Sequence, residues 1–319
     1  MDKTLAPFSD KPSAALKPHD TRIEPPRRSR RKHLTFTPYL YTLPALILVG
    51  GVILYGIAAN VLYSTWDWNG ISPTHVEVGL GNFQKIAADP VFWQALRNTA
   101  LFGVICVFTQ MILGFLLAIL VRTRSRGSGL LRTMLFVPVV LSGVVVATSF
   151  TQLLTPDGAF NQILRAIGFG GFSHAWLADP RTALLTIAAI NIWQFTGYSF
   201  VIYDAGLGQI DGSILEAARM DGASTLQLLR RVVFPLMNGS HLILIVLGFI
   251  GSLKTFELVF LTTGGGPGTS TEFLTTYIYR MAIPEFHAGY AAALSIALAF
   301  FAILLAAMQL LLTRRTREG

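Results

Sequence analysis

The sequence predicts an all-α membrane protein with six transmembrane helices and both termini in the cytoplasm. The 319-residue chain is 52% hydrophobic and 13% charged, whereas soluble domains average about 25% charged residues. The charges are segregated, which leaves apolar runs of about 20 residues, the length that crosses a bilayer as a helix. These runs lack the period-two alternation of barrel strands. A helical bundle in a membrane is therefore the expected fold.

The apolar runs define the spans, and the charges between them set the orientation. The predicted spans cover 40–63, 98–121, 131–153, 183–206, 241–262 and 288–313. Arginine and lysine gather in 122–132, in 207–240 and at the C-terminal end, and they are sparse in 64–97, 154–182 and 263–287. Because positively charged loops stay inside, the connections 122–132 and 207–240 are expected in the cytoplasm.

The N-terminal part lies outside the spans. Residues 1–37 are polar and hold a basic run at 27–32, so we expect a disordered cytoplasmic tail. A secretory signal has a short basic segment before a short apolar core. Here the apolar run is long enough to span, so 38–78 are expected to hold an uncleaved first helix and the start of an external loop. The basic run also suits anionic lipid or nucleic acid. Its position favours topology determination, and we expect no nucleic-acid partner. Residues 314–319 form a basic C-terminal tail.

The polar island at 211–236 is predicted to form two short helices joined by a tight turn. Asp211 is a good N-cap, because its short side chain can accept from the free N–H groups of the first turn. Gly222 lies where the first helix would end with positive φ. Ser224, with a glutamine three residues on, has the spacing of a capping box. Pro235 lacks the N–H that would continue the second helix.

The spacing of Glu216, Ala217, Ala218, Gly222 and Pro235 resembles the EAA loop of ABC-importer permeases. In that family the loop is a coupling helix that sits in a cleft of a cytoplasmic ATPase and transmits its motion to the membrane helices. The resemblance implies that Glu216 pairs with a basic residue of the ATPase, and that the two alanines allow close approach. The ordinary alternative is an amphipathic hairpin between spans.

Other stretches extend the resemblance to the carbohydrate-uptake branch of this family, close to the permeases for maltose and glycerol 3-phosphate. Residues 80–99, Asn161 after the third span and the string Thr263–Pro267 are similar to its patterns. The resemblance implies a type I ABC importer permease fold over 79–313, with 207–240 as the coupling loop. It also implies a multi-pass location in a bacterial inner membrane.

The resemblance further implies the partners. The chain has no Gly-Lys-Ser/Thr phosphate-binding loop, so ATP and Mg are expected to bind a separate ATPase subunit. We therefore expect no enzyme activity, catalytic residue, metal or cofactor in this chain. The expected assembly holds a second homologous permease, two cytoplasmic ABC ATPase subunits and an external or periplasmic solute-binding protein. The expected substrate is a sugar or a sugar phosphate.

Polar residues inside the spans are candidates for the substrate pathway. Asn191, Gln194 and Tyr198 follow a spacing of three and four in the fourth span, which places them on one helical face, and Trp193 adds an aromatic ring. Buried amides are costly in lipid, so they are expected to face a cavity or another helix. Contact with substrate and packing between helices remain open alternatives.

Lys254 and Glu257 form the only oppositely charged pair inside an apolar run. Charges within a membrane segment are candidates for function, so both residues are candidates for the substrate pathway. On a continuous helix a spacing of three lets two such side chains neutralise each other. A structural ion pair near the outer end of the span is therefore the alternative.

Two other classes of function compete with an ATP-driven importer. An ion-coupled secondary transporter of small polar solutes would carry an intramembrane acid or a helix broken at the midplane, and neither is evident in the sequence. A membrane-bound signalling or scaffolding protein would bind a partner through its basic tail. Neither class explains the helix–turn–helix island at 211–236.

Overall fold

The computed structural model describes residues 37–123 and 128–317, so the basic run at 27–32 lies outside the described residues. The chain divides into two units, Met1–Gly50 and Gly51–Gly319. In the first unit, helix α1 spans Thr37–Leu48. The π-helical segment η1 (Val49–Leu54) follows it in the sequence.

The second unit continues with α2 (Tyr55–Tyr63) and two short antiparallel strands, β1 (Trp66–Asp67) and β2 (Val76–Glu77). Trp66 lies opposite Glu77, and Asp67 lies opposite Val76. This strand pair is a small departure from the all-α prediction. It closes the connection between the first and second predicted spans.

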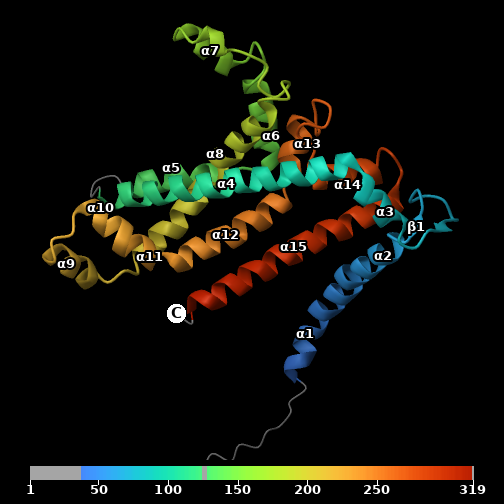
Figure 1. Ribbon diagram of the computed structural model, residues 1–319, viewed down its shortest axis with the longest axis horizontal. Coiled ribbons are helices and arrows are strands. Elements are labelled where there is room, and N and C mark those ends of the chain that lie inside the picture. Colours follow the sequence, from blue (N-terminus) through green and yellow to red (C-terminus); the bar gives the residue numbers. More distant parts are fainter. Residues whose placement is uncertain (1–36, 124–127, 318–319) are drawn as a thin grey trace, which may run out of the picture. The chain divides into compact units, whose positions relative to one another are not determined.

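The remaining elements are helical (Figure 1). Those before the fourth predicted span are α3 (Gly81–Ala88), α4 (Pro90–Thr123), α5 (Ser128–Val140), α6 (Gly143–Leu153), α7 (Ala159–Ala166) and the 3-10 turn η2 (Gly170–Phe172). Those that follow are α8 (Ala183–Leu207), α9 (Gly212–Met220), α10 (Thr225–Leu228), the π-helical η3 (Leu229–Val233), α11 (Phe234–Leu236), α12 (Asn238–Leu253), α13 (Glu257–Thr262), α14 (Leu274–Ala282) and α15 (Ala288–Arg317).

Four helices in the described part of the chain are long and apolar enough to cross a membrane. They are Tyr41–Tyr63, Pro90–Arg122, Ala183–Leu207 and Ala288–Gln309. Two bent pairs also qualify: Ser128–Val140 with Gly143–Leu153, bent by 93°, and Thr225–Leu236 with Asn238–Leu253, bent by 64°. Length and composition therefore give four to six candidate spans.

The third predicted span is broken, which corrects the expectation of one helix over 131–153. Pro138 lies near the end of α5 and has no N–H to bond one turn back. Ser142 then adopts an extended conformation before α6 begins at Gly143. A Cβ at Gly143 would lie 2.7 Å from a carboxylate oxygen of Glu257, so glycine permits the close approach of α13 at this break.

The fifth predicted span is also broken, which corrects the expectation of one helix over 241–262. α12 ends at Leu253 and α13 begins at Glu257. Between them the carbonyl of Thr255 accepts a hydrogen bond from the Thr275 hydroxyl at 2.6 Å. A side chain from a distant segment thus satisfies one of the carbonyl groups at the end of α12.

Helix α8 is central to the second unit, because it packs against α4, α5 and α12. Small residues allow these contacts. A Cβ at Gly197 of α8 would lie 1.9 Å from the carbonyl oxygen of Leu135 in α5. A Cβ at Gly114 of α4 would lie 2.8 Å from the backbone nitrogen of Phe200. At these two glycines the backbone of α8 therefore packs directly against the backbones of α4 and α5, without side chains between them.

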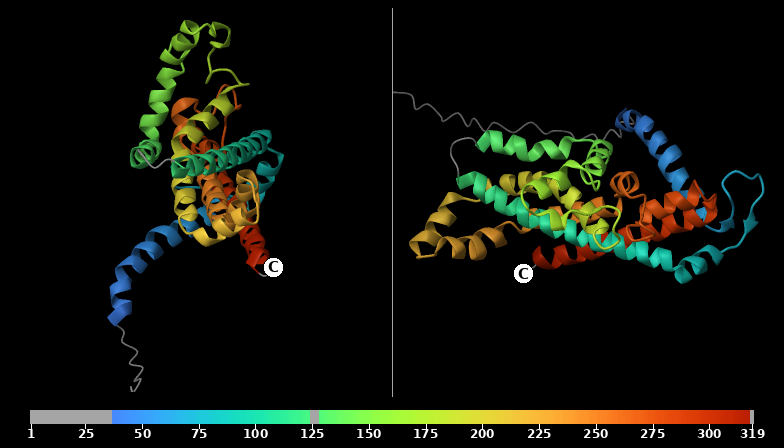
Figure 2. Two further views of the ribbon diagram at one scale, coloured as in Figure 1. Left: turned by 90° about the vertical axis from the view of Figure 1, so that its left-hand side faces the viewer. Right: turned by 90° about the horizontal axis from the view of Figure 1, so that it is seen from above.

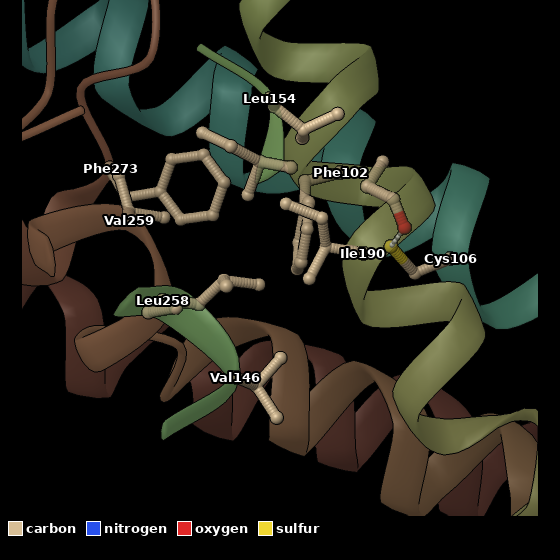
Figure 3. Close-up of a cluster of buried hydrophobic side chains, with 11 residues drawn as sticks. Phe102, Cys106, Val146, Leu154, Ile190, Leu258, Val259 and Phe273 are labelled. Atoms are coloured by element: carbon tan, nitrogen blue, oxygen red, sulfur yellow. Dashed lines mark hydrogen bonds between the residues drawn. The ribbon is translucent and has the colours of Figure 1, made fainter. Parts of the chain in front are cut away.

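A buried apolar cluster joins α4, α6, α8 and α13 (Figure 3). Phe102, Val146, Ile190 and Val259 are each no more than 2% exposed. Cys106 lies in the same cluster, and its thiol donates to the carbonyl of Ala188. This cluster holds the two helices that follow the breaks, α6 and α13, against the continuous helices α4 and α8.

The two ends of the second unit carry different elements. α9 and α10 lie toward the end at which α15 finishes, whereas α3, α14 and the strands lie where α15 begins (Figures 1 and 2). α12 lies between α4 and α15 and contacts both. The island at 211–236 and the C-terminal end of α15 thus occupy the same end of the unit.

Candidate functional site

A cavity of about 680 Å³ opens between α4, α8, α12 and the two helix breaks. Asn191, Gln194 and Tyr198 line it from α8, and Lys254 and Glu257 line it from the break between α12 and α13. Five of the six residues predicted for the substrate pathway therefore meet around one space. The three on α8 share a face because this helix is continuous, which preserves their spacing.

Trp193 is the exception, because its side chain does not line this cavity. The side chain is 46% exposed and packs edge-to-face on Phe150, with ring centroids 5.1 Å apart. Two residues correspond to a rotation of about 200° around a helix, so Trp193 points away from the face that holds Asn191. The aromatic walls of the cavity come instead from Phe195, Tyr198 and Phe256.

Buried amides organise the inner wall of the cavity. The Gln110 amide of α4 donates to the backbone oxygen of Asn191 at 3.1 Å and to its side-chain oxygen at 3.0 Å. The Gln194 amide donates to the carbonyl of Leu141 at 3.1 Å, which is one of the groups freed where α5 ends. Sequence reasoning missed Gln110, although an amide in an otherwise apolar run was the available signal.

The two charges at the cavity do not pair with each other. Among the ion pairs of the described residues none joins Lys254 to Glu257, and both side chains are exposed. The alternative of a structural ion pair is wrong because it assumed a continuous helix, whereas Lys254 caps α12 and Glu257 begins α13. Both groups therefore face the cavity available for hydrogen bonding to a solute.

The cavity combines charged and amide groups with apolar and aromatic walls, including Val107, Met111 and Leu247. Ligand pockets generally mix a few placed polar groups with apolar surface in this way. No group of three or more His, Cys, Asp or Glu side chains in the described residues is placed to hold a metal ion. The arrangement is suited to holding a polar solute by hydrogen bonds and ring contacts.

The local structure of the island at 211–236 follows the predicted capping. The Asp211 carboxylate accepts from the N–H of Ser213 at 2.9 Å, and this bond lowers the pKa of its carboxyl group. Gly222 has φ +81°, and the next N–H returns to the carbonyl of Ala218 at 3.1 Å. Ser224 forms both bonds of the predicted capping box. These predictions are confirmed.

The surface of this island is exposed on several sides. Glu216 and Ala217 are exposed and Ala218 is half-buried, while the apolar side chains Met220 and Leu226 are 88% and 74% exposed. No ion pair within the described residues reaches Glu216. A carboxylate beside small and apolar exposed groups has the character of a docking surface.

Pro235 lies where the island joins α12. The helical turns pass through it, and α11 ends one residue later, so the predicted end of this helix is almost correct. The chain then bends by 64° into α12. The π-helical turn η3 directly precedes α11. Sharp helix kinks often occur at π-helical turns.

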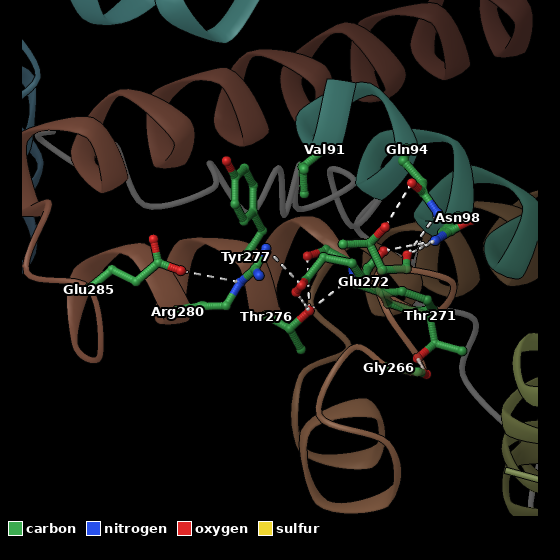
Figure 4. Close-up of polar contacts among 12 residues, drawn as sticks. Val91, Gln94, Asn98, Gly266, Thr271, Glu272, Thr276, Tyr277, Arg280 and Glu285 are labelled. Carbon is green, nitrogen blue, oxygen red and sulfur yellow. Dashed lines mark hydrogen bonds and ion pairs between the residues drawn. The ribbon is translucent and has the colours of Figure 1, made fainter. Parts of the chain in front are cut away.

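A second polar network, which sequence reasoning missed, fixes the glycine loop that follows α13 (Figure 4). Glu272 is 2% exposed, accepts from the Thr276 hydroxyl at 2.6 Å and pairs with Arg280 at 3.1 Å. A Cβ at Gly265 would lie 2.9 Å from this carboxylate. The Asn98 amide donates to the backbone oxygen of Glu272 at 3.1 Å. The available signal was the spacing of four between acid, threonine and arginine.

Burial dominates the electrostatics of Glu272. Desolvation raises the pKa of its carboxyl group, and the Thr276 hydroxyl and the Arg280 guanidinium oppose this rise only in part. The acid is structural, because it fastens α14 to the loop at 263–268 and leaves no free face toward solvent.

Residues 110–318, more than half of the chain, match the model of the family described as binding-protein-dependent transport system inner membrane component. The chain belongs to this family. Its members are transport components, so the permease assignment based on the EAA spacing is confirmed. With several apolar helices, the chain is a multi-pass membrane protein.

Curated relatives agree with this assignment. The permease is 34% identical to the probable ABC transporter permease protein YurN of Bacillus subtilis, over 88% of this chain and 97% of that protein. It is 33% identical to the lactose transport system permease protein LacF of Rhizobium radiobacter, over 91% and 98% of the two chains.

A solved structure shares the fold. A chain of the bacterial alginate ABC transporter, crystallised in complex with an alginate pentasaccharide-bound periplasmic protein, aligns with a TM-score of 0.77 and 23% identity. The alignment covers 88% of the permease and 95% of that chain. The broken helices therefore occur within an ABC importer permease fold.

Replacing Gln194 with leucine is expected to lower the stability of the permease by about 1 kcal/mol, because the Leu141 carbonyl loses its amide donor. The cost is limited because Leu141 is 40% exposed and water in the cavity can reach it. The measurement is the thermal unfolding midpoint in detergent. Gln152→Leu, on the exposed side of α6, is the matched control. Equal midpoints for the two variants would contradict the prediction.

The junction between α3 and α4 should respond to acid. Asp89 accepts from the Tyr277 and Tyr290 hydroxyls at 2.5 and 2.6 Å. Partial burial acts to raise the pKa of its carboxyl group, but these bonds and the N–H groups of Val91 and Phe92 outweigh it, so the pKa lies below its ordinary value.

A lowered pKa in the folded state makes the carboxylate stabilising above the unfolded pKa of about 3.9. This contribution is lost as the pH falls through the folded value. We expect wild type to melt above Asp89→Asn at neutral pH, and the difference to shrink between about pH 5 and pH 3. A difference that stays constant over this range would show that the charge of Asp89 contributes nothing.

Proposed function

We propose that this permease is one membrane subunit of an ATP-driven carbohydrate importer in a bacterial inner membrane. Its partners are a second homologous permease, two cytoplasmic ABC ATPases and a solute-binding protein outside the membrane. The observation that carries the proposal is the exposed segment around Glu216, capped at both ends and attached through α11 to the helices that line the cavity. The membership of a binding-protein-dependent family supports it.

The proposed arrangement in the membrane has six spans, with both termini in the cytoplasm. The six are the four long helices, α5 together with α6, and α12 together with α13. The charge distribution along the chain supports this orientation. The position of 211–236 at the end where α15 finishes is consistent with it, because both segments would then face the cytoplasm. Trp66, Phe273 and their neighbours at the other end would lie outside.

The proposed substrate is a sugar, held in the cavity between α4, α8 and α12. Asn191, Gln194 and Tyr198 offer donors and acceptors on one face, and Lys254 and Glu257 offer charged partners on the other. Phe256 supplies an apolar ring surface. The names of the lactose permease LacF and of the alginate transporter support a carbohydrate, since both proteins are described by saccharides.

The proposed coupling site is the surface of α9 and the turn that follows it. Glu216 offers a carboxylate to a basic group of the ATPase, and Ala217 and Ala218 let the partner approach closely. Gly222 shapes the turn after α9, and Pro235 lies where the island joins α12. ATP and Mg are bound and used in the ATPase, so this chain performs no catalysis and holds no cofactor.

Ion-coupled transporters also use broken helices at their binding sites, so the breaks at this cavity are compatible with that class too. An ion-coupled permease has no use for an exposed, unpaired Glu216 on a capped helix at the far end from the glycine loop. The family match covers this segment as well as the cavity. ATP drive is therefore favoured over an ion gradient.

The test is uptake in liposomes that hold the permease with its partner permease, ATPases and solute-binding protein. We expect uptake of the sugar bound by the solute-binding protein only when ATP and Mg are enclosed with the ATPases. An ionophore that collapses ion gradients should have no effect. Uptake that persists without ATP and stops with the ionophore would overturn the proposal.

A further inference from the structure

The island at 211–236 is called the coupling segment below. Four aromatic rings meet where it joins the membrane helices: Phe115 of α4, Tyr203 of α8, Phe234 of α11 and His241 of α12. We call this group the aromatic joint. The Phe234 and His241 rings lie 4.3 Å apart, and the Phe115 ring lies 5.3 Å from Tyr203 and 5.7 Å from Phe234. The joint therefore connects the coupling segment to three other helices at one point.

Two hydrogen bonds run through the joint in a defined direction. His241 Nε2 lies 3.0 Å from the carbonyl oxygen of Phe234, and His241 Nδ1 lies 2.7 Å from the Tyr203 hydroxyl. A carbonyl can only accept, so for neutral His241 Nε2 carries the proton and Nδ1 accepts from the tyrosine. One imidazole thus ties the backbone of the coupling segment to a side chain of α8.

The joint is buried and closely packed. Tyr203 is 1% exposed and His241 is 9% exposed, so a broken bond would leave a buried polar group without its partner. The bend itself sits against α8: Met237 is 2% exposed, and a Cβ at Gly206 would lie 2.7 Å from its terminal methyl group and 2.5 Å from the Ser240 hydroxyl. A displacement of the segment is therefore passed on to α8 rather than absorbed.

We infer that His241 and Tyr203 are positioning residues that carry movement of the coupling segment to α8, and so to the cavity. α8 is one unbroken helix, and Tyr198 lies on the cavity little more than one turn from Tyr203. The inference rests on the proposed ATP-driven function. Neither residue belongs to the Glu216 surface, so the joint acts after the ATPase has docked.

Proximity alone does not show that Tyr203 and His241 act through one connection. The test is whether the effects of substituting the two residues depend on each other. The variants are Tyr203→Phe, which deletes one oxygen atom, His241→Phe, which keeps a ring, and the double variant. The readout in the reconstituted transporter is sugar transported per ATP hydrolysed. We expect each single variant to lower this ratio about tenfold and the double variant to lower it no further, because both substitutions break one connection.

Tyr277→Phe is the matched control. Its hydroxyl is also buried and hydrogen-bonded, to Asp89, but it lies in α14 at the opposite end of the unit. We expect this variant to lower the melting temperature and to leave the transport ratio unchanged. Retention of the ATPase on the purified permease is measured for every variant, since the joint is not the docking surface.

The outcomes separate the inference from the proposed function. Wild type that shows no ATP-driven uptake overturns both. If wild type shows ATP-driven uptake and Tyr203→Phe transports as much sugar per ATP as wild type, the inference alone is overturned. An equal fall of the ratio in Tyr277→Phe also overturns it, because lost stability would then explain the effect. If His241→Phe fails to assemble, Tyr203→Phe decides the question by itself.

Discussion

Replacing Gly197 with valine is expected to prevent α5 from packing on α8 and to abolish the accumulation of folded permease. A Cβ at this position would lie 1.9 Å from the carbonyl oxygen of Leu135 and 3.3 Å from the Cα of Phe136. These are backbone atoms, so no side-chain rotation can relieve the overlap. Overpacking of this kind costs about 3 kcal/mol or more, and α5 also forms part of the cavity wall.

The measurement is the yield of monodisperse permease in detergent, together with its melting temperature. Gly56→Val in α2 is the matched control, because no atom lies within 4 Å of a Cβ at Gly56. The control should be purified in nearly wild-type amounts. A Gly197→Val protein with wild-type yield and melting temperature would show that α5 and α8 do not approach this closely.

The parts of the site that sequence could predict are those fixed by local geometry. Asp211, Gly222 and Ser224 cap helices through bonds to residues two to five positions away, so their roles can be read from spacing alone. Asn191 and Gln194 were placed on one face correctly for the same reason, because α8 is an uninterrupted helix.

The parts that sequence could not predict depend on distant segments. The alternative role for Lys254 and Glu257, an ion pair across one helical turn, required a continuous helix. The helix stops between them, and the Thr255 carbonyl accepts a hydrogen bond from Thr275. The bend of the third span likewise places Gly143 against Glu257, more than a hundred residues away in the sequence. Hydropathy reports that a run is apolar, and it is insensitive to such breaks.

The absence of Trp193 from the cavity lining has a different origin. The residue was chosen for its chemistry, since sugars stack on aromatic rings, while its angular position on α8 already excluded it from the face of Asn191. The ring that lies on this face is Tyr198, and Phe256 joins it only through the break before α13. Angular position was the better guide wherever the helix stayed continuous.

Reversing the charge of Glu216 is expected to detach the ATPase and to lower ATP-driven uptake by about tenfold or more. The side chain is exposed on α9 and has no ion-pair partner within the described residues, so the substitution should leave the fold of the permease intact. The measurements are the ATPase retained by the tagged permease and the uptake in liposomes. Glu216→Gln, which removes the charge without reversing it, should have a smaller effect.

Asp157→Arg is the matched control for Glu216→Arg, because it makes the same reversal at an acid that is 97% exposed, in the connection between α6 and α7. The Asp157 carboxylate pairs with Arg165 at 3.8 Å, and exposed pairs of this kind contribute little to stability. ATPase retention should therefore stay at the wild-type level in this variant. If Glu216→Arg retained the ATPase as well, the exposed apolar groups Met220 and Leu226 would have to supply the docking free energy, and the carboxylate would have no part in coupling.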